Sequence, residues 1–357
     1  MRHRQFIGAR LDSIVTRRLG TTLRHLGWAP RLVPFTGYGS PAGVRVLGQL
    51  VLSPAQQRRA LPLRSARWLN RRGWRNFFAL PIPHAAVRIS LGSVTQTLDT
   101  DRRGYIDTTL VASGLSPGWH AAQLESSGAS PVTAPVQVIS DDTELGIISD
   151  IDDTIITTSL PRPLVAIWNS FIQPEVNRQA VPGMARMYRE LLSNHPQTPV
   201  IYVSTGPWTA LPFLTRFMDR HHFPAGPMLL TDLGPTPTNW LRSGQQHKRH
   251  TLDQLAQALP NVSWLLIGDD GQHDRRLYRR FAQRWPGRVR AIAIRTLTPT
   301  QQVLAHGTVV GLEHGDGRWI RHSVPEFLGA DGNELAPAVL RLLADPADPT
   351  VGASRSM

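Results

Sequence analysis

Two aspartates, Asp150 and Asp152, directly follow the short apolar run 145–149. A β-branched run of this length is typical of a central strand in a parallel sheet, and ligands of such sheets bind at the carboxyl ends of the strands. At that position one carboxylate can attack phosphorus and form an aspartyl phosphate, while a second protonates the leaving oxygen and later activates water. The spacing therefore suits Asp150 as nucleophile and Asp152 as general acid and base. Asp-rich stretches also cap helices and form turns, so this segment alone leaves both interpretations open.

Two further residues carry groups that suit a phosphate. Ser204 ends a second apolar run, 199–203, which precedes a helix-like stretch over 208–220, and its hydroxyl could hold a phosphate oxygen. Lys248 is the only lysine among 39 Lys and Arg residues. A compact ammonium can contact a phosphate and a carboxylate as a point charge, which a guanidinium replaces poorly. We therefore place Lys248 in the site; the alternative is a surface lysine retained by chance.

A third apolar run, 263–267, leads into a second group of acids that includes Asp269, Asp270 and Asp274. Magnesium prefers oxygen ligands in an octahedron and usually keeps several waters. One carboxylate from Asp150, one from Asp269 and a backbone carbonyl would be sufficient protein ligands. The sequence thus predicts a Mg²⁺ site where two strands end.

These segments, in this order, resemble the haloacid dehalogenase (HAD) superfamily, with its Asp-x-Asp-x-Thr motif, a strand ending in Ser or Thr, a Lys and a Gly-Asp-x-x-x-x-Asp motif. The strings 202–208, 247–248 and 266–270 are similar to the actin-patch-associated phosphatidate phosphatase family and its bacterial relatives. The resemblance covers about residues 145–300. One departure is Thr205-Gly206 after Ser204, where Asn-Ser is common in that family, and it falls on the substrate side.

The resemblance implies a role for each matching residue. The catalytic residues would be Asp150, Asp152, Ser204 and Lys248. The metal ligands would be Asp150, Asp152 through its main-chain carbonyl, and Asp269, and the supporting residues Thr154, Asp270 and Asp274. The implied activity is that of a magnesium-dependent phosphatase that converts phosphatidate to diacylglycerol and phosphate through an aspartyl-phosphate intermediate.

The chain around these motifs leaves little room for a cap domain. Fewer than thirty residues separate Thr154 from Pro182, and about forty separate Gly206 from Lys248. By analogy, a sparsely capped site suits a bulky substrate. The apolar stretch 160–173 is more typical of a core than of a lipid slot.

The positive charge is concentrated at one end of the chain. The formal net charge is +13, yet the first 98 residues hold sixteen Arg and one acid, and the remainder sums to −2. Residues 7–26 have the pattern of a basic amphipathic helix, and residues 58–78 interleave Arg with Trp and Phe, as at a membrane interface. We therefore expect an anionic membrane surface to be contacted through residues 1–78. Nucleic-acid binding and packing of the helix on the catalytic domain are the alternatives.

The predicted fold class is α/β, with a HAD-like Rossmannoid parallel sheet and a minimal cap, preceded by a small all-β sandwich-like domain. The expected parts are a basic amphipathic helical segment (1–33), an Arg- and Trp-rich connecting region (34–84), the sandwich-like domain (85–142), the catalytic domain (143–300), its C-terminal extension (301–345) and a disordered tail (346–357). The absence of cysteine excludes disulfides and thiol catalysis but does not decide the compartment. There is no spanning segment or clear signal peptide, so we expect a cytoplasmic protein with peripheral membrane association.

Three other functions fit parts of the pattern. The same residues could serve a phosphatase of nucleic-acid ends or phosphoproteins. A small-metabolite phosphatase is disfavoured by the sparse cap. A non-enzymatic membrane or scaffold protein is disfavoured because Asp150, Asp152, Lys248 and Asp269 are all present. Nothing in the sequence predicts an oligomeric state.

Overall fold

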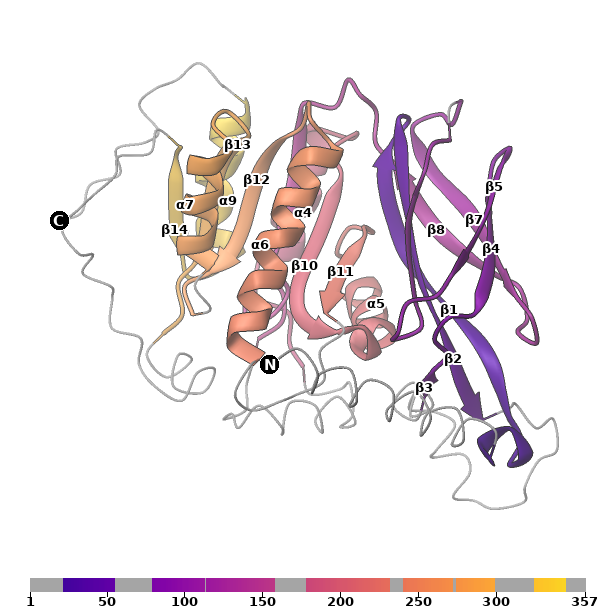
Figure 1. Cartoon of the computed structure of the whole chain (residues 1–357). Coiled ribbons are helices and arrows are strands. Elements are labelled where there is room, and N and C mark those ends of the chain that lie inside the picture. Colours follow the sequence, from indigo (N-terminus) through magenta and orange to yellow (C-terminus); the bar gives the residue numbers. More distant parts are fainter. Residues whose placement is uncertain are drawn as a thin grey trace, which may run out of the picture. The chain divides into compact units, whose positions relative to one another are not determined.

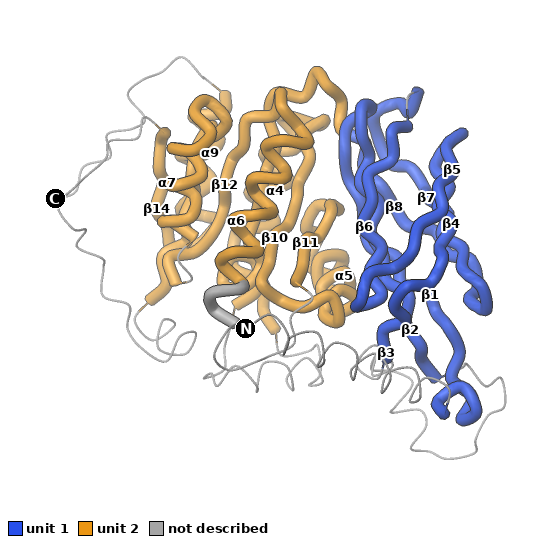
Figure 2. Tube along the Cα trace, in the orientation of Figure 1, with its two compact units in different colours: residues 1–138 blue, residues 139–357 orange. Residues whose placement is uncertain are grey.

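The computed structural model describes residues 22–54, 79–112, 114–157, 178–231, 240–271, 274–298 and 324–344. The chain divides into two compact units, Met1–Val138 and Ile139–Met357 (Figure 2). Several predictions lie outside the described residues: the first two-thirds of the amphipathic helix, the Arg- and Trp-rich stretch 58–78, the apolar stretch 160–173 and the tail 346–357. Among the described residues, no helix is long and apolar enough to cross a bilayer.

The described part of the first unit is built mainly on one eight-stranded sheet (Figure 1). Its strands are β1 (Trp28–Ser40), β2 (Gly43–Pro54), β3 (Leu80–Pro81), β4 (Ala86–Leu91), β5 (Val94–Asp99), β6 (Tyr105–Leu110), β7 (Gly118–Ser126) and β8 (Val132–Val138). The order is β3-β2-β1-β8-β7-β4-β5, with β6 also paired to β2. The β1–β8 pair is parallel, and the other pairs are antiparallel.

Alternating side chains explain the strands of this unit. In β4, Val87, Ile89 and Leu91 are buried while the intervening residues are more exposed, as expected for a sheet with one covered face. This burial pattern is that of a strand in the predicted β domain. A turn follows β5, where a carboxylate oxygen of Asp101 accepts hydrogen bonds from the backbone N–H groups of Arg103 and Tyr105.

The extent of this β unit differs from the prediction. Strands β1 and β2 lie largely in the segment expected to be a connecting region, and they belong to the same sheet as the strands after residue 85. The described strands are hydrogen-bonded into one continuous sheet. Prolines, glycines and arginines within β1 and β2 obscure the alternation that identifies the later strands.

The second unit contains a six-stranded, fully parallel sheet of order β11-β10-β9-β12-β13-β14. The strands are β9 (Leu145–Ser149), β10 (Val200–Pro207), β11 (Met228–Thr231), β12 (Ser263–Asp269), β13 (Val289–Arg295) and β14 (Glu326–Gly329). The helices are α4 (Met184–Asn194), α5 (Leu211–Arg220), α6 (Trp240–Ala258), α7 (Asp274–Arg284) and α9 (Gly332–Ala344), and a 3₁₀ turn (Trp208–Ala210) precedes α5.

The winding of this sheet determines where a ligand can bind. From β9 the chain proceeds outward through β10 to β11 and then returns to β12 on the other side of β9 (Figure 1). Such a reversal of strand order is a topological switch point, and ligands bind there at the carboxyl ends of the strands. The strands predicted at 145–149, 199–203 and 263–267 are confirmed as β9, β10 and β12.

Helices cover the strands, whose sequences are apolar over nearly their whole length. Apolar side chains of α4, α5 and α9 form one buried cluster with strand residues such as Ile147, Tyr202 and Ile267. Helices α6 and α7 contact each other and also pack on β10 and β12. Burial of nearly every strand residue explains the continuous hydrophobic runs in the sequence.

Close contact between two helix starts anchors α9. Gly183, which precedes α4, has φ +71°, and a Cβ on it would lie 2.4 Å from the backbone nitrogen of Asn333. The backbone N–H of Gly332 donates a 2.9 Å hydrogen bond to the carbonyl of Pro182. Only glycine allows this approach without strain. The described part of the predicted C-terminal extension, residues 324–344, is therefore packed into the parallel-sheet unit.

Candidate active site

The predicted nucleophile and the predicted metal ligand lie at the ends of two adjacent strands. Asp150 directly follows β9, and Asp269 is the last residue of β12. The two strands are hydrogen-bonded neighbours, and the backbone N–H of Asp150 donates a 2.9 Å hydrogen bond to the carbonyl of Ile267. Both carboxylates thus lie at the switch point, as the sequence predicted.

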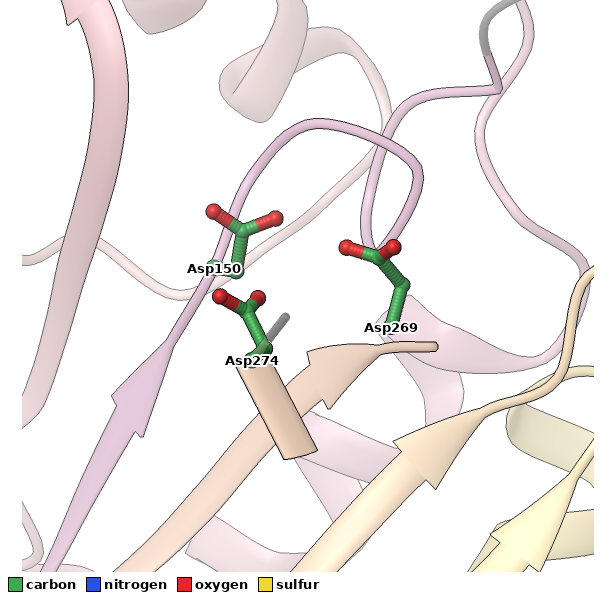
Figure 3. A group of neighbouring side chains, drawn as sticks. All are labelled: Asp150, Asp269 and Asp274. Atoms are coloured by element: carbon green, nitrogen blue, oxygen red, sulfur yellow. The ribbon is translucent and has the colours of Figure 1, made fainter. Parts of the chain in front are cut away.

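Lys248 and Asp274 complete a buried charged cluster. The ammonium of Lys248, from α6, lies 2.7 Å from a carboxylate oxygen of Asp150 and 2.7 Å from one of Asp274, the first residue of α7. All three residues are buried. Figure 3 shows the carboxylates of Asp150, Asp269 and Asp274 directed towards a common space. Lys248, which the sequence assigned to the site, thus lies between two of its carboxylates.

Burial controls the ionisation of this cluster. Burial raises the pKa of Asp150, the nearby acids Asp274 and Asp152 raise it further, and Lys248 opposes the rise. Burial, together with Asp274 and Asp150, likewise raises the pKa of Asp269. Burial alone would lower the pKa of Lys248, but the surrounding carboxylates outweigh that effect and raise it. The lysine is thus held as a cation among three carboxyl groups, of which Asp150 and Asp269 bind protons more readily than free aspartates do.

The cluster has the chemistry of a divalent-cation site. One oxygen from each of Asp150, Asp269 and Asp274 lies within 4.8 Å of the other two. The Oδ2 atoms of Asp269 and Asp274 are buried and accept no hydrogen bond from the residues that the structure describes. Buried oxygens without a partner are costly, and three carboxylates are hard ligands of the kind that Mg²⁺ prefers. The residues therefore fit the predicted metal, and Asp274, predicted as a supporting residue, offers a third carboxylate beside those of Asp150 and Asp269.

Asp152 and Ser204 form a separate pair beside this cluster. The Ser204 hydroxyl donates a 2.9 Å hydrogen bond to Asp152 and accepts one of the same length from the backbone N–H of Gly206. Asp152 is partly exposed, whereas Asp150 is buried. A general acid and base must exchange protons with solvent, and the more accessible Asp152 is better placed to do so than the buried Asp150. The Asp152 side chain is not among the three carboxylates that converge, in keeping with its predicted ligation through the main chain.

The other two predicted supporting residues have different surroundings. Thr154 is buried, and its hydroxyl donates a long hydrogen bond of 3.4 Å to Oδ2 of Asp150. Asp270 accepts a 2.9 Å hydrogen bond from the backbone N–H of Leu297 and so ties the end of β12 to the chain after β13. Thr154 contacts the predicted nucleophile, whereas Asp270 contributes to local structure.

Sequence reasoning missed the residues that hold the backbone of Asp150. The Ser149 hydroxyl donates a 2.6 Å hydrogen bond to the Asp150 carbonyl and lies 2.6 Å from the hydroxyl of Tyr188. The hydroxyl of Tyr278 donates to the Ile267 carbonyl, which also accepts from the Asp150 N–H. Two buried tyrosines thus fix the peptide groups on either side of the nucleophile. Neither carries a spacing signal, because both lie on the apolar faces of their helices.

The comparisons with known proteins concern the same part of the chain. Residues 145–296 match the family described as the catalytic domain of phosphatidate phosphatase APP1. An uncharacterised protein of Schizosaccharomyces pombe is 28% identical over 152 residues, and phosphatidate phosphatase APP1 of Saccharomyces cerevisiae is 27% identical over 152 residues. Each match covers 42% of this chain and about a quarter of the relative, 25% and 26% respectively.

Similarity to solved structures is weak. A carbohydrate acetylesterase from Xanthomonas citri shares 9% identity, with 80% of this chain and 75% of that chain covered, at a TM-score of 0.27. No argument rests on a likeness of that size. The family match is therefore the informative comparison, and it relates residues 145–296 to a phosphatase catalytic domain. This segment holds every predicted site residue, whereas β14 and α9 lie beyond it.

Proposed function

We propose that this chain is a magnesium-dependent phosphatase of the HAD type that acts on phosphatidate through an aspartyl phosphate on Asp150. One observation carries the proposal: the buried cluster of Asp150, Lys248, Asp269 and Asp274 lies at the switch point of a parallel sheet, inside the segment that matches a phosphatidate phosphatase catalytic-domain family. The activity in the name of the Saccharomyces cerevisiae relative belongs to a protein of which only 26% is matched.

The proposed reaction has two transfers. A carboxylate oxygen of Asp150 attacks phosphorus, the bond from phosphorus to the ester oxygen breaks, and Asp152 gives its proton to the leaving oxygen. Asp152 then removes a proton from water, which attacks the aspartyl phosphate and releases inorganic phosphate. Lys248, held between Asp150 and Asp274, keeps a positive charge beside the phosphoryl oxygens. When bound, magnesium would neutralise phosphoryl charge and help to hold the phosphoryl group in line with Asp150.

Phosphatidate is favoured as substrate by the name of the yeast relative and by the small amount of chain available for a cap.

We propose contact with an anionic membrane surface through the basic segments that flank the β1–β2 hairpin. Residues from Trp28 onward already belong to the β sheet, because β1 begins there. A deletion that tests the contact should therefore remove residues 1–21 only. It should reduce binding to anionic vesicles and leave hydrolysis of a soluble aryl phosphate unchanged; equal losses would assign the segment to the fold.

The activity is tested by phosphate release from phosphatidate in mixed micelles, with magnesium or with chelator. We expect magnesium-dependent release that falls by about 10⁴-fold in Asp150→Asn, because the nucleophile is lost. Asp142→Asn, at an exposed aspartate before β9, is the matched control and should keep wild-type activity. Turnover of an aryl phosphate or of a phosphorylated oligonucleotide without turnover of phosphatidate would retain the phosphatase and reject the lipid substrate.

A further inference from the structure

A buried arginine joins the predicted catalytic loop to the start of α9. Arg295 is the last residue of β13 and is only 3% exposed. Its Nη1 donates a 2.6 Å hydrogen bond to the carbonyl of Asp153, and its Nε donates a 3.0 Å bond to the carbonyl of Ala330. One guanidinium thus connects residues that follow β9 with residues that follow β14.

The Asp153 end of this bridge lies in an unusual backbone conformation. Asp153 has φ +58°, in the left-handed region that residues other than glycine rarely adopt. The loop closes on itself, because the N–H of Asp153 donates to the carbonyl of Ile156, and the N–H groups of Ile155 and Ile156 donate to that of Ile151. Asp152 belongs to this loop. A left-handed residue persists only where the surroundings hold it, and such strain concentrates at active sites.

The Ala330 end is equally well fixed. Asp331 accepts hydrogen bonds from the backbone N–H groups of Asn333 and Glu334, and the Glu334 carboxylate accepts one from the N–H of Ala330. This reciprocal capping closes the first turn of α9. The same turn packs on the start of α4 through Gly183. Ala330 is therefore a rigid point of attachment.

We propose that Arg295 is a positioning residue for Asp152: it holds the loop 150–156 against the start of α9 and thereby aims the general acid and base. The proposal rests on the function proposed above. The orientation of Asp152 would then depend on β14 and α9, which lie beyond the residues matched by the phosphatase family.

The two bonds explain why arginine is needed. The Nε and Nη1 atoms are held in one plane at a fixed spacing, so that a single side chain can bind two carbonyls at once. A lysine carries one nitrogen and would reach one carbonyl or the other. If Arg295 merely supplied a buried positive charge, Lys would replace it; if it works as a bridge, Lys would not.

Arg288 provides a matched control. It precedes β13, at the opposite end of the strand from the site, and it also donates to backbone carbonyls, those of Val262, Ala256 and Leu259. Arg288→Lys therefore breaks a similar set of bonds without touching the loop. Glu334→Ala is a second test variant, because it loosens the Ala330 end through an exposed side chain and leaves Arg295 in place.

The experiment combines hydrogen exchange with steady-state kinetics on a soluble aryl phosphate. In Arg295→Lys and in Glu334→Ala we expect faster amide exchange at residues 153–156 than in wild type or in Arg288→Lys. We expect kcat to fall roughly 10- to 100-fold in Arg295→Lys, because a displacement of about 1 Å is enough for such a loss. KM should change by less than about twofold. Added guanidinium ion should partly restore kcat in Arg295→Ala and have no effect in Arg288→Ala.

The proposal would be overturned if the amides of residues 153–156 exchanged at the wild-type rate in both Arg295→Lys and Glu334→Ala. A kcat of Arg295→Lys within about twofold of the wild-type value would also overturn it. If Arg295→Lys does not fold, Glu334→Ala alone decides between these outcomes. An inactive wild-type protein would reject the proposed function, yet the exchange data would still test whether Arg295 holds the loop.

Discussion

The hydroxyl of Ser204 donates a hydrogen bond of 2.9 Å to the carboxylate of Asp152. The sequence predicted that Ser204 holds a phosphate oxygen, whereas here its proton is directed towards the proposed general acid and base. The backbone N–H of Gly206 fixes the serine oxygen from the other side. Ser204 can therefore orient Asp152 before any substrate is bound, and the two roles predict different kinetic effects.

Ser204→Ala should separate these roles. If Ser204 orients Asp152, kcat should fall by about 10- to 100-fold, since general acid–base catalysis by a placed side chain contributes about 10²–10⁴-fold. KM for an aryl phosphate should then change little, and Ser204→Thr should keep most of the activity. A large rise in KM with unchanged kcat would instead assign the hydroxyl to phosphate binding.

Asp152→Asn should uncouple the two transfers of the proposed reaction. Asp150 and Lys248 remain in place, so a substrate with a good leaving group can still phosphorylate the enzyme. Hydrolysis of the intermediate should slow by about 10²–10⁴-fold, because water is no longer deprotonated. Acid quenching with a radiolabelled substrate should show phosphoenzyme in this variant and none in Asp150→Asn. A wild-type rate would remove Asp152 from the acid–base role.

Magnesium should stabilise the fold, and more strongly at neutral than at acid pH. Burial raises the pKa of Asp150 and Asp269, so the folded protein binds protons that the unfolded chain releases. The metal-free protein should therefore lose stability as pH rises above the ordinary carboxyl pKa of about 4. Magnesium replaces those protons and should add about 2.7 kcal/mol at a hundredfold excess over Kd.

Thermal unfolding at pH 5 and pH 7.5, with magnesium or with chelator, measures this effect. Asp269→Asn should raise the metal-free Tm at pH 7.5 and abolish most of the magnesium shift, whereas Asp142→Asn should change neither. A magnesium shift retained in Asp269→Asn would place the metal elsewhere.

Asp153→Val should destabilise the protein relative to Asp153→Asn. Both variants remove the carboxylate, but Asn tolerates the left-handed conformation at this position, while a β-branched residue does not. We expect a difference of about 1–2 kcal/mol in the free energy of unfolding, measured with urea on the metal-free protein. Equal stabilities would mean that the loop relaxes out of this conformation.

The sequence predicted the central strands of the parallel sheet, because they depend on local pattern. Apolar runs that end in polar residues mark β9, β10 and β12, and the carboxyl ends of parallel strands meet at one edge. Asp150, Lys248 and Asp269 could thus be brought together from their motifs. The rarity of lysine supplied a signal for Lys248 that its place within a helix would not have given.

Contacts between distant residues could not be predicted in this way. Arg295 is one of 38 arginines, and nothing in its neighbourhood in the sequence distinguishes it. Tyr188 and Tyr278 look like ordinary core residues. The early strands β1 and β2 were missed because prolines and glycines interrupt them, and pairing with later strands overrides their weak local pattern.

The hydrogen bond from Arg295 to the carbonyl of Asp153 joins residues that are 142 positions apart in the sequence. Contacts of such high sequence separation form late, because the chain must close a long loop before they contribute to stability. On a ribosome, β9 and Asp150, the proposed nucleophile, emerge well before β13 and α9. If Arg295 positions Asp152 as proposed, the nascent chain carries Asp150 for much of its synthesis without the geometry for catalysis, and activity should begin only after α9 has docked.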